Sequence, residues 1–96
     1  MIHEIATITI DSAKAAEFES AVESAKPYFE SASGYVSFSL QKSIENAGRY
    51  LLIVGWDSVD AHMVDFRNSD GFQVWRTLVG GFFVSPPSVE HTATVI

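Results

Sequence analysis

Apolar and polar residues alternate along several short stretches of the chain, and a period of two is typical of half-buried strands. The plainest alternation runs over residues 35–43, where Val, Phe and Leu alternate with Tyr, Ser and Gln. Residues 2–10 are rich in β-branched side chains and predict an earlier strand. The apolar face of this first strand contains one acid, Glu4, near its start.

Two more strands are predicted further along the chain. Residues 49–56 are apolar on both faces, which favours a central strand covered on both sides. The Glu-Asn-Ala-Gly segment at 45–48 is rich in turn-forming residues, so we expect strands 35–43 and 49–56 to pair as a hairpin. Residues 89–95 alternate again and predict the last strand.

A period of three to four residues predicts two helices between these strands. The first follows the Asp-Ser pair at 11–12, whose side chains can cap a helix, and Pro27 should end or kink it. The second follows another Asp-Ser pair at 57–58, breaks at residues 68–71 and ends at the glycine pair 80–81.

The order of these elements, β-α-β-β-α-β, predicts the fold. With right-handed crossovers it gives an α+β ferredoxin-like sandwich, a four-stranded antiparallel sheet with two helices on one face. The other face is bare in a single chain, although residues 51–54 supply apolar side chains to both faces. Because such a patch needs a cover, and a second copy is the simplest cover, we expect a homodimer.

Composition narrows the picture to one small domain spanning residues 1–96. Hydrophobic residues make up 47% and charged residues 19% of the chain, which is typical of a globular domain. Six Lys and Arg against twelve Asp and Glu give a net charge of −6, which disfavours nucleic acid and anionic membranes as partners. The absence of cysteine excludes disulfides, thiolate metal sites and a Cys nucleophile. There is no apolar run of ~20 residues and no signal-peptide pattern, so we expect a cytoplasmic protein.

A family resemblance is carried by residues 52–62 (Leu-Ile-Val-Gly-Trp-Asp-Ser-Val-Asp-Ala-His) and 69–75 (Ser-Asp-Gly-Phe-Gln-Val-Trp). These residues resemble the antibiotic biosynthesis monooxygenase family. The shared pattern is an apolar strand that ends in Trp, a capped helix, a short break, and then two aromatic residues one turn apart. The resemblance implies a dimeric α+β barrel. It also implies an oxygenase without flavin, metal or other cofactor, which acts on a quinol or polycyclic phenol that supplies its own electrons to O₂.

A second branch of this family degrades haem, using an Asn on the first strand and a His on the second helix. The first strand here has Thr7 and Thr9 in place of an Asn, and the position of the helical His holds Trp75 or Arg76. The resemblance therefore does not extend to the haem-degrading branch.

His62 is the candidate catalytic residue. It shares a helical stripe with Val59, Met63 and Phe66 and should therefore face the sheet. A neutral imidazole with a pKa near 6.5 suits the removal of a phenolic proton. The alternative is that His62 only hydrogen-bonds a backbone carbonyl or Asp65.

The twelve aromatic residues are numerous for so small a core, which favours either a ligand cavity or a subunit interface. The candidate ligand-binding residues are Trp56, Phe66, Phe72, Trp75, Arg76 and Tyr35. The aromatic ones can stack on a flat ligand or simply fill the core, and Arg76 can bind a carboxylate or phenolate or face water. His91 can line the cavity or pack in the core or an interface, and we expect the latter. We expect Phe82-Phe83 at a dimer contact rather than in a hinged flap. No metal site is expected, because the three His residues share no ligand spacing.

The leading hypothesis is a cofactor-independent monooxygenase for a quinol or polycyclic phenol, in which His62 accepts or orients the proton. Two alternatives stay open. One is a non-catalytic small-molecule binding or interaction module on the same fold, and the other is an isomerase of the muconolactone type.

Overall fold

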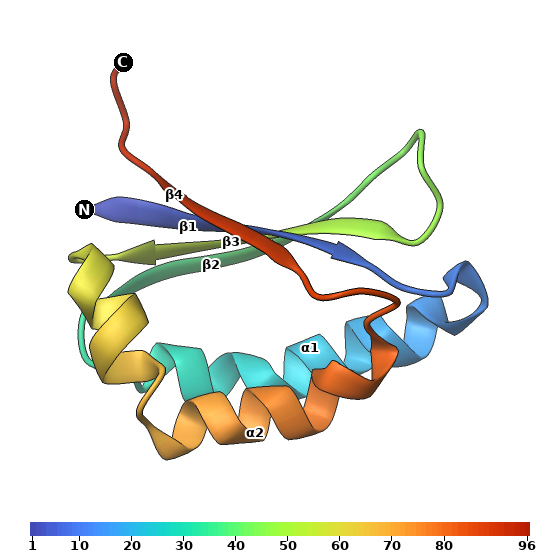
Figure 1. The fold of residues 1–96 in the computed structure, drawn as a ribbon, viewed down its shortest axis with the longest axis horizontal. Coiled ribbons are helices and arrows are strands. Elements are labelled where there is room, and N and C mark those ends of the chain that lie inside the picture. The colour runs from blue at the N-terminus through green and yellow to red at the C-terminus, as the bar shows by residue number, and fades with distance from the viewer.

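The computed structural model describes all 96 residues, which form four strands, two α-helices and three short helical segments (Figure 1). The strands are β1 (Ile2–Thr9), β2 (Tyr35–Lys42), β3 (Arg49–Trp56) and β4 (Ser88–Thr92). The helices are α1 (Ala15–Glu30) and α2 (Asp70–Val79), and the short segments are η1 (Ser12–Lys14), η2 (Ala61–Phe66) and η3 (Gly80–Phe82).

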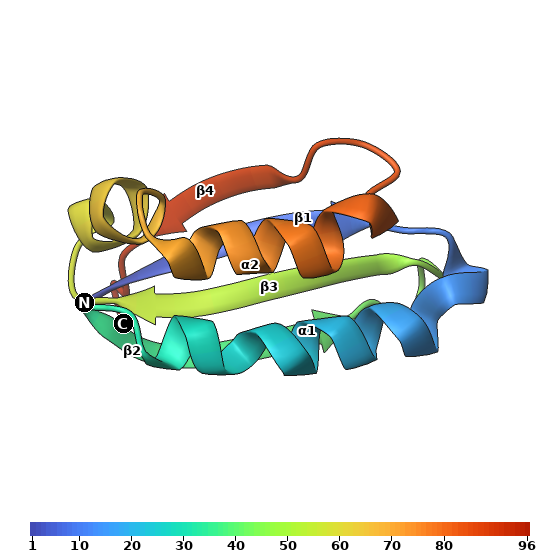
Figure 2. The same cartoon turned by 90° about the horizontal axis from the view of Figure 1, so that it is seen from below.

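The sheet has the strand order β2-β3-β1-β4, and every neighbouring pair is antiparallel. Both α-helices lie side by side on one face of this sheet (Figure 2). This arrangement confirms the predicted ferredoxin-like α+β fold. The predicted hairpin also forms, with Phe38 of β2 opposite Val54 of β3.

The hydrophobic core lies between the sheet and the helices. Every second residue of β3 from Tyr50 to Trp56 is buried there, as the period of two requires. From α1, the residues spaced by three or four positions enter the same layer: Phe18, Val22, Ala25 and Phe29. The aromatic residues that looked numerous in the sequence therefore fill much of this layer.

The first helix does not end at Pro27, which was one of the two effects predicted for this proline. Helix α1 runs through Pro27 to Glu30. A proline this close to the helix end removes only one intrahelical hydrogen bond. Phe29, on the same turn, is 1% exposed and packs with its ring centroid 4.6 Å from that of Phe66. The burial of Phe29 favours continuation of the helix.

Two other predictions need correction. The residues of η2 form a π-helix, which buries His62 and Phe66 but leaves Val59, just before it, 42% exposed. The wider turn of a π-helix changes which positions share a face, so the predicted stripe does not include Val59. The last strand ends at Thr92, short of the predicted end at Val95, which is fully exposed beyond the edge of the sheet.

The sheet face without helices carries a strip of partly exposed apolar residues. Leu51 and Ile53 of β3 and Ile5 of β1 lie on it, because they alternate with buried neighbours along their strands. Ile5 stands directly opposite Ile53. None of the helices combines the length and the apolar character needed to cross a membrane.

Candidate functional site

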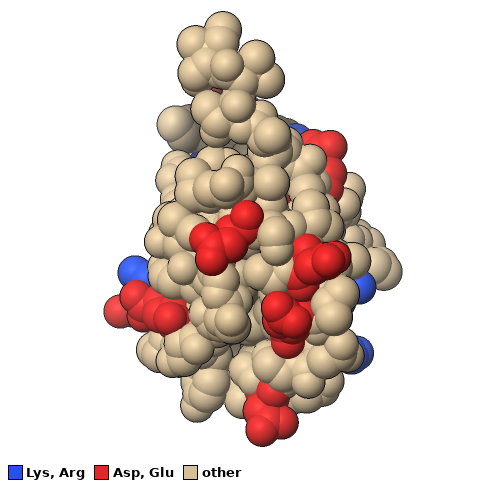
Figure 3. All heavy atoms as spheres, turned by 90° about the vertical axis from the view of Figure 1, so that its left-hand side faces the viewer, with Lys and Arg blue, Asp and Glu red and all other residues tan.

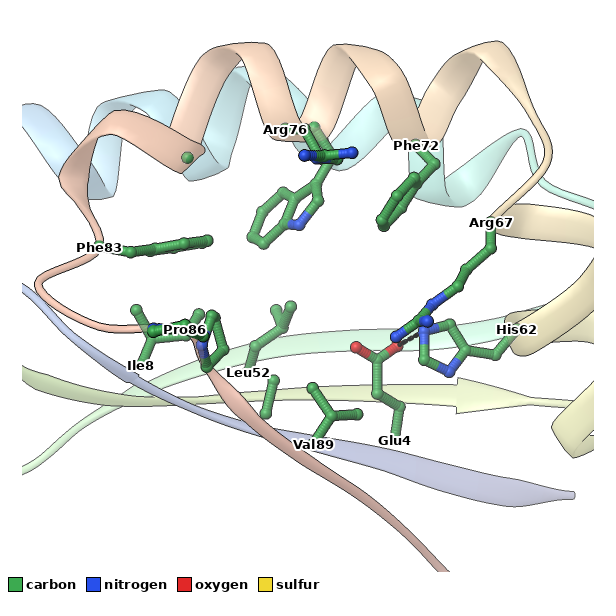
Figure 4. Close-up of a pocket in the computed structure, with 14 residues that line it drawn as sticks. Glu4, Ile8, Leu52, His62, Arg67, Phe72, Arg76, Phe83, Pro86 and Val89 are labelled. Carbon is green, nitrogen blue, oxygen red and sulfur yellow. Dashed lines mark ion pairs between the residues drawn. The ribbon is translucent and has the colours of Figure 1, made fainter.

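A cavity of about 370 Å³ lies between α2, the sheet and the segment that leads into β4 (Figure 4). Its polar lining residues are Glu4, His62, Arg67 and Arg76. Its apolar walls come from Phe72, Trp75, Phe83, Pro86 and Pro87, and its sheet side comes from Ala6, Ile8, Leu52 and Val89. A hollow with aromatic walls and a few convergent polar groups is the usual form of a small-molecule site.

Glu4 is the acid at the sheet side of this cavity. It alternates with Ala6 and Ile8 on the buried face of β1, so its side chain points beneath the helices and is only 5% exposed. The indole Nε1 of Trp56 donates a hydrogen bond of 3.0 Å to Glu4 Oε1. Burial raises the pKa of Glu4 from 4.5 to about 7, although the Trp56 hydrogen bond and the charge of Arg67 act in the opposite direction.

The second carboxyl oxygen of Glu4 is free. Both close contacts of this carboxyl group, from Trp56 and from His62, are made to Oε1. No fully buried side-chain oxygen or nitrogen lacks a partner, so Oε2 borders open space, and one carboxyl oxygen points into the cavity in Figure 4. A ligand in the cavity can therefore hydrogen-bond to Oε2.

His62 lies beside Glu4 and is 4% exposed. Its Nε2 is 3.2 Å from Glu4 Oε1, and its ring stacks on Trp56 with an interplanar angle of 15°. Burial, together with the electrostatic effect of the neighbouring His91 and Arg67 side chains, lowers the pKa of His62 from 6.5 to about 4. His62 is therefore neutral at neutral pH and carries one ring proton.

His91 extends this group of side chains toward the surface. It stands directly opposite Glu4 in the pairing of β1 with β4, and its Nε2 is 2.8 Å from His62 Nδ1. Since neutral His62 has one N–H, it either donates to Glu4 and accepts from His91, or donates to His91 and accepts from a protonated Glu4. Glu4, His62 and His91 thus form a hydrogen-bonded network with two possible proton arrangements, which we call the Glu4–His91 network.

Two arginines border the cavity on either side of Phe72. The guanidinium carbons of Arg67 and Arg76 each lie 6.0 Å from the centroid of the Phe72 ring. The ion pairs of the structure are Lys42–Glu19 and His62–Glu4. Neither arginine of the cavity is therefore paired with a carboxylate.

The structure brings some of the predicted site residues together and separates others. His62, Phe72, Trp75 and Arg76 line the cavity. Trp56 is completely buried behind it and holds Glu4. The other two candidates lie outside the lining: Phe66 is in the core against Phe29, and Tyr35 packs edge-on against Trp56.

The sequence analysis missed four features of the site. Glu4 and Arg67 were given no role, the contact of His91 with His62 was not predicted, and Phe83 was not placed at the cavity. Phe83 lines the cavity of its own chain, and its expected contact with a second chain stays a prediction. An acid in the apolar face of a predicted strand was the available signal for Glu4. No group of three or more His, Asp or Glu side chains is arranged to hold a metal ion.

The family assignment follows from a match between residues 1–78 and the family model described as antibiotic biosynthesis monooxygenase. This match covers most of the chain. The chain belongs to the antibiotic biosynthesis monooxygenase family. The matched residues include Glu4, His62 and both arginines of the cavity, whereas His91 and Phe83 lie beyond them.

Three similar proteins place this family member more closely. The chain is 36% identical over 91 residues to the uncharacterized protein YczJ of Bacillus subtilis (strain 168), covering 95% of this chain and 96% of YczJ. It is 47% identical to a protein of Bordetella bronchiseptica that is provisionally named an antibiotic biosynthesis monooxygenase. The crystal structure of that protein matches with a TM-score of 0.96, over 99% of this chain and 97% of the other. SnoaB of Streptomyces nogalater, described as a cofactor-independent oxygenase, shares the fold with 23% sequence identity. Its TM-score is 0.79, and the match covers 99% of this chain and 94% of SnoaB.

Proposed function

We propose that this protein is a monooxygenase that oxidises a quinol or polycyclic phenol without a bound cofactor. The observation that carries the proposal is the free Oε2 atom of Glu4, which borders a cavity with aromatic walls. A carboxylate with a pKa of about 7 is well matched to take a proton at neutral pH, because a general base works best when its pKa lies near the working pH.

The chemistry begins with the removal of the phenolic proton by Glu4. The resulting phenolate is electron-rich enough to reduce O₂, which is the second substrate. The balanced reaction is phenol plus O₂ giving quinone plus water. The ring loses its O–H and one C–H hydrogen, one oxygen atom becomes the new carbonyl, and the other leaves as water with these two hydrogens. The positive charge of Arg67 stabilises the phenolate.

His62 acts here as a positioning residue and not as the first proton acceptor. Its lowered pKa makes it a weak base, whereas its 3.2 Å approach to Oε1 fixes the carboxyl group of Glu4. Through the 2.8 Å contact with His91, it also gives the proton taken up by Glu4 a way toward the surface. This role replaces the expectation that His62 itself removes the proton, and keeps the expectation that it orients the reaction.

Support for the oxygen chemistry comes from similarity. The Bordetella bronchiseptica protein carries the same provisional name as the family, and SnoaB is described as a cofactor-independent oxygenase. The aromatic walls formed by Phe72, Trp75 and Phe83 suit a flat ring and exclude water from the phenolate.

We also propose that the protein is a homodimer that joins its bare sheet faces. Ile5, Leu51 and Ile53 form an apolar strip in the middle of this face, and polar residues such as Ser39 and Gln41 of β2 flank it. An apolar centre with a polar rim is the usual composition of a subunit interface.

An isomerase of the muconolactone type is the second candidate. Glu4 and His62 provide a base and a proton relay in one cavity, and both are what a transfer of a proton between two carbons requires. Such a reaction needs no O₂, so it proceeds in an anaerobic solution. A binding module would bind the same ligands and convert none of them.

The test measures O₂ consumption with a panel of quinols and polycyclic phenols that includes 1-naphthol, under ¹⁸O₂ and against the uncatalysed rate. We expect one ¹⁸O atom per product quinone from the wild type and a rate at least about 100-fold lower for Glu4→Gln. Glu23→Gln is the matched control, because Glu23 is exposed on α1, away from both the cavity and the bare sheet face. No O₂ consumption above background with any of these compounds contradicts the proposal.

A further inference from the structure

The charge of the cavity differs from the charge of the rest of the molecule. The chain carries twelve Asp and Glu against six Lys and Arg, and acidic side chains are spread over the end that carries η2 (Figure 3). Two of the six basic residues, Arg67 and Arg76, line the cavity, and Glu4 is its only carboxyl group. The cavity is therefore the place on an acidic protein where an anion is attracted.

Arg76 has no carboxylate partner within the protein. It projects from α2 one helical turn after Phe72, and no carboxylate lies within ion-pair distance of its guanidinium group. The planar guanidinium group of an arginine can donate two parallel N–H hydrogen bonds to one carboxylate. Arg76, solvated at the mouth of the cavity, can therefore bind the carboxylate of a ligand that packs against Phe72 and Trp75.

Arg76 and Glu4 lie on opposite sides of the cavity. Glu4 comes from β1 in the sheet and Arg76 from α2 above it, with the aromatic walls between them (Figure 4). Arg67 points toward Glu4 and His62 in the same view. A ligand whose hydroxyl group meets Glu4 therefore presents its far end to Arg76.

From these observations we propose that the cavity selects an aromatic ligand with a carboxylate at the end opposite its phenolic hydroxyl, and that Arg76 binds this carboxylate. The inference names the substrate class of the site proposed above and in that respect rests on it. Binding, however, needs neither O₂ nor turnover and is measured separately from activity.

The experiment compares two probes of equal shape by isothermal titration calorimetry without O₂: 6-hydroxy-2-naphthoate and the neutral 6-hydroxy-2-naphthamide. We expect the wild type to bind the carboxylate at least about tenfold more tightly than the amide. Arg76→Gln should abolish this preference and leave the affinity for the amide unchanged within about twofold. Raising NaCl from about 0.05 to 0.5 M should reduce the preference, because salt screens an exposed ion pair.

Two further variants separate charge from folding. Arg76→Lys keeps the positive charge and should keep part of the preference. Lys26→Gln, at an exposed cation of α1 outside the cavity, should behave as wild type, and thermal unfolding shows whether each variant is folded.

Three results would overturn the inference: equal affinities for the two probes, an equal loss for both probes in Arg76→Gln, or no binding of either probe at concentrations up to about 10 mM. Selective binding of the carboxylate without O₂ consumption would instead leave this inference standing and contradict the oxygenase. Oxidation of neutral phenols without a preference for carboxylates would leave the oxygenase proposal standing and contradict this inference.

Discussion

The indole Nε1 of Trp56 donates a hydrogen bond of 3.0 Å to Oε1 of Glu4, which joins the last residue of β3 to the buried acid of β1. With His62 on the same oxygen, this bond leaves Oε2 of Glu4 directed at the cavity. The three side chains together convert a buried acid, which is costly in an apolar core, into a group able to exchange a proton with a ligand.

Replacing Trp56 with Phe tests this hydrogen bond. The bond lowers the pKa of Glu4, so its loss should raise this pKa further and move the acid limb of the activity profile to higher pH. The smaller ring should also cost about 1 to 3 kcal/mol in the free energy of unfolding. Urea unfolding and a pH series of kcat/KM check both effects. An unmoved acid limb in the folded variant would show that the bond does not tune Glu4.

The dependence of stability on pH should differ between variants of Glu4 and His62. Native Glu4 keeps a proton between about pH 4.5 and 7 that the unfolded chain has lost, so its contribution to stability falls as pH rises. Native His62 lacks a proton between about pH 4 and 6.5 that the unfolded chain carries, so its contribution rises with pH. Each change amounts to about 3 kcal/mol.

In the wild type these two contributions largely cancel, and single variants separate them. Relative to wild type, the free energy of unfolding of Glu4→Gln should rise by about 3 kcal/mol as pH rises from about 4.5 to 7. The free energy of unfolding of His62→Asn, relative to wild type, should fall by a similar amount as pH rises from about 4 to 6.5. Urea titrations at a series of pH values measure both. Parallel curves for the three proteins would contradict the assigned protonation states.

His91→Ala tests whether the Glu4–His91 network is a route for protons. Loss of the outer imidazole should slow turnover about tenfold, and added imidazole should restore part of the rate, because it can occupy the vacated space and exchange protons. Gln73→Ala is the control, since Gln73 is exposed on α2 and does not line the cavity. A rate loss that imidazole does not rescue would indicate a structural role for His91.

Ile53→Glu tests the proposed homodimer. A charge in the middle of the apolar strip should separate the subunits, because burying an unpaired carboxylate at an interface is costly. Static light scattering at micromolar concentration should give the mass of two chains for wild type and of one for the variant. Val64→Glu, at an exposed position on η2, should stay dimeric. A monomeric wild type would contradict the proposal directly.

The sequence was sufficient to predict the fold, because the periods of two and 3.6 reported which faces are buried. Phe18, Val22 and Phe29 on α1 and the alternating residues of β3 followed these periods. The helix continues past Pro27 because Phe29 packs in the core, which a local rule does not include, and Val59 lies off the predicted stripe because the period changes within a π-helix.

The site was only partly predictable from the sequence. His62 and the aromatic residues of α2 could be located, since a helical stripe is a local pattern. The meeting of Glu4, His62 and His91 depends on the register between β1 and β4, which brings together residues from the two ends of the chain. Such a long-range pairing leaves no local signal other than the acid that interrupts the apolar face of β1.

The central claim is that Glu4 removes the proton from a phenol in the cavity, and the pH profile of kcat/KM for the oxidation of that phenol tests it most directly. For wild type we predict activity that falls below an apparent pKa of about 7, set by the protonation of Glu4. Glu4→Gln should be at least about 100-fold slower at pH 8 and lack this acid limb. A Glu4→Gln protein with the wild-type profile and a rate within about twofold of wild type would contradict the account.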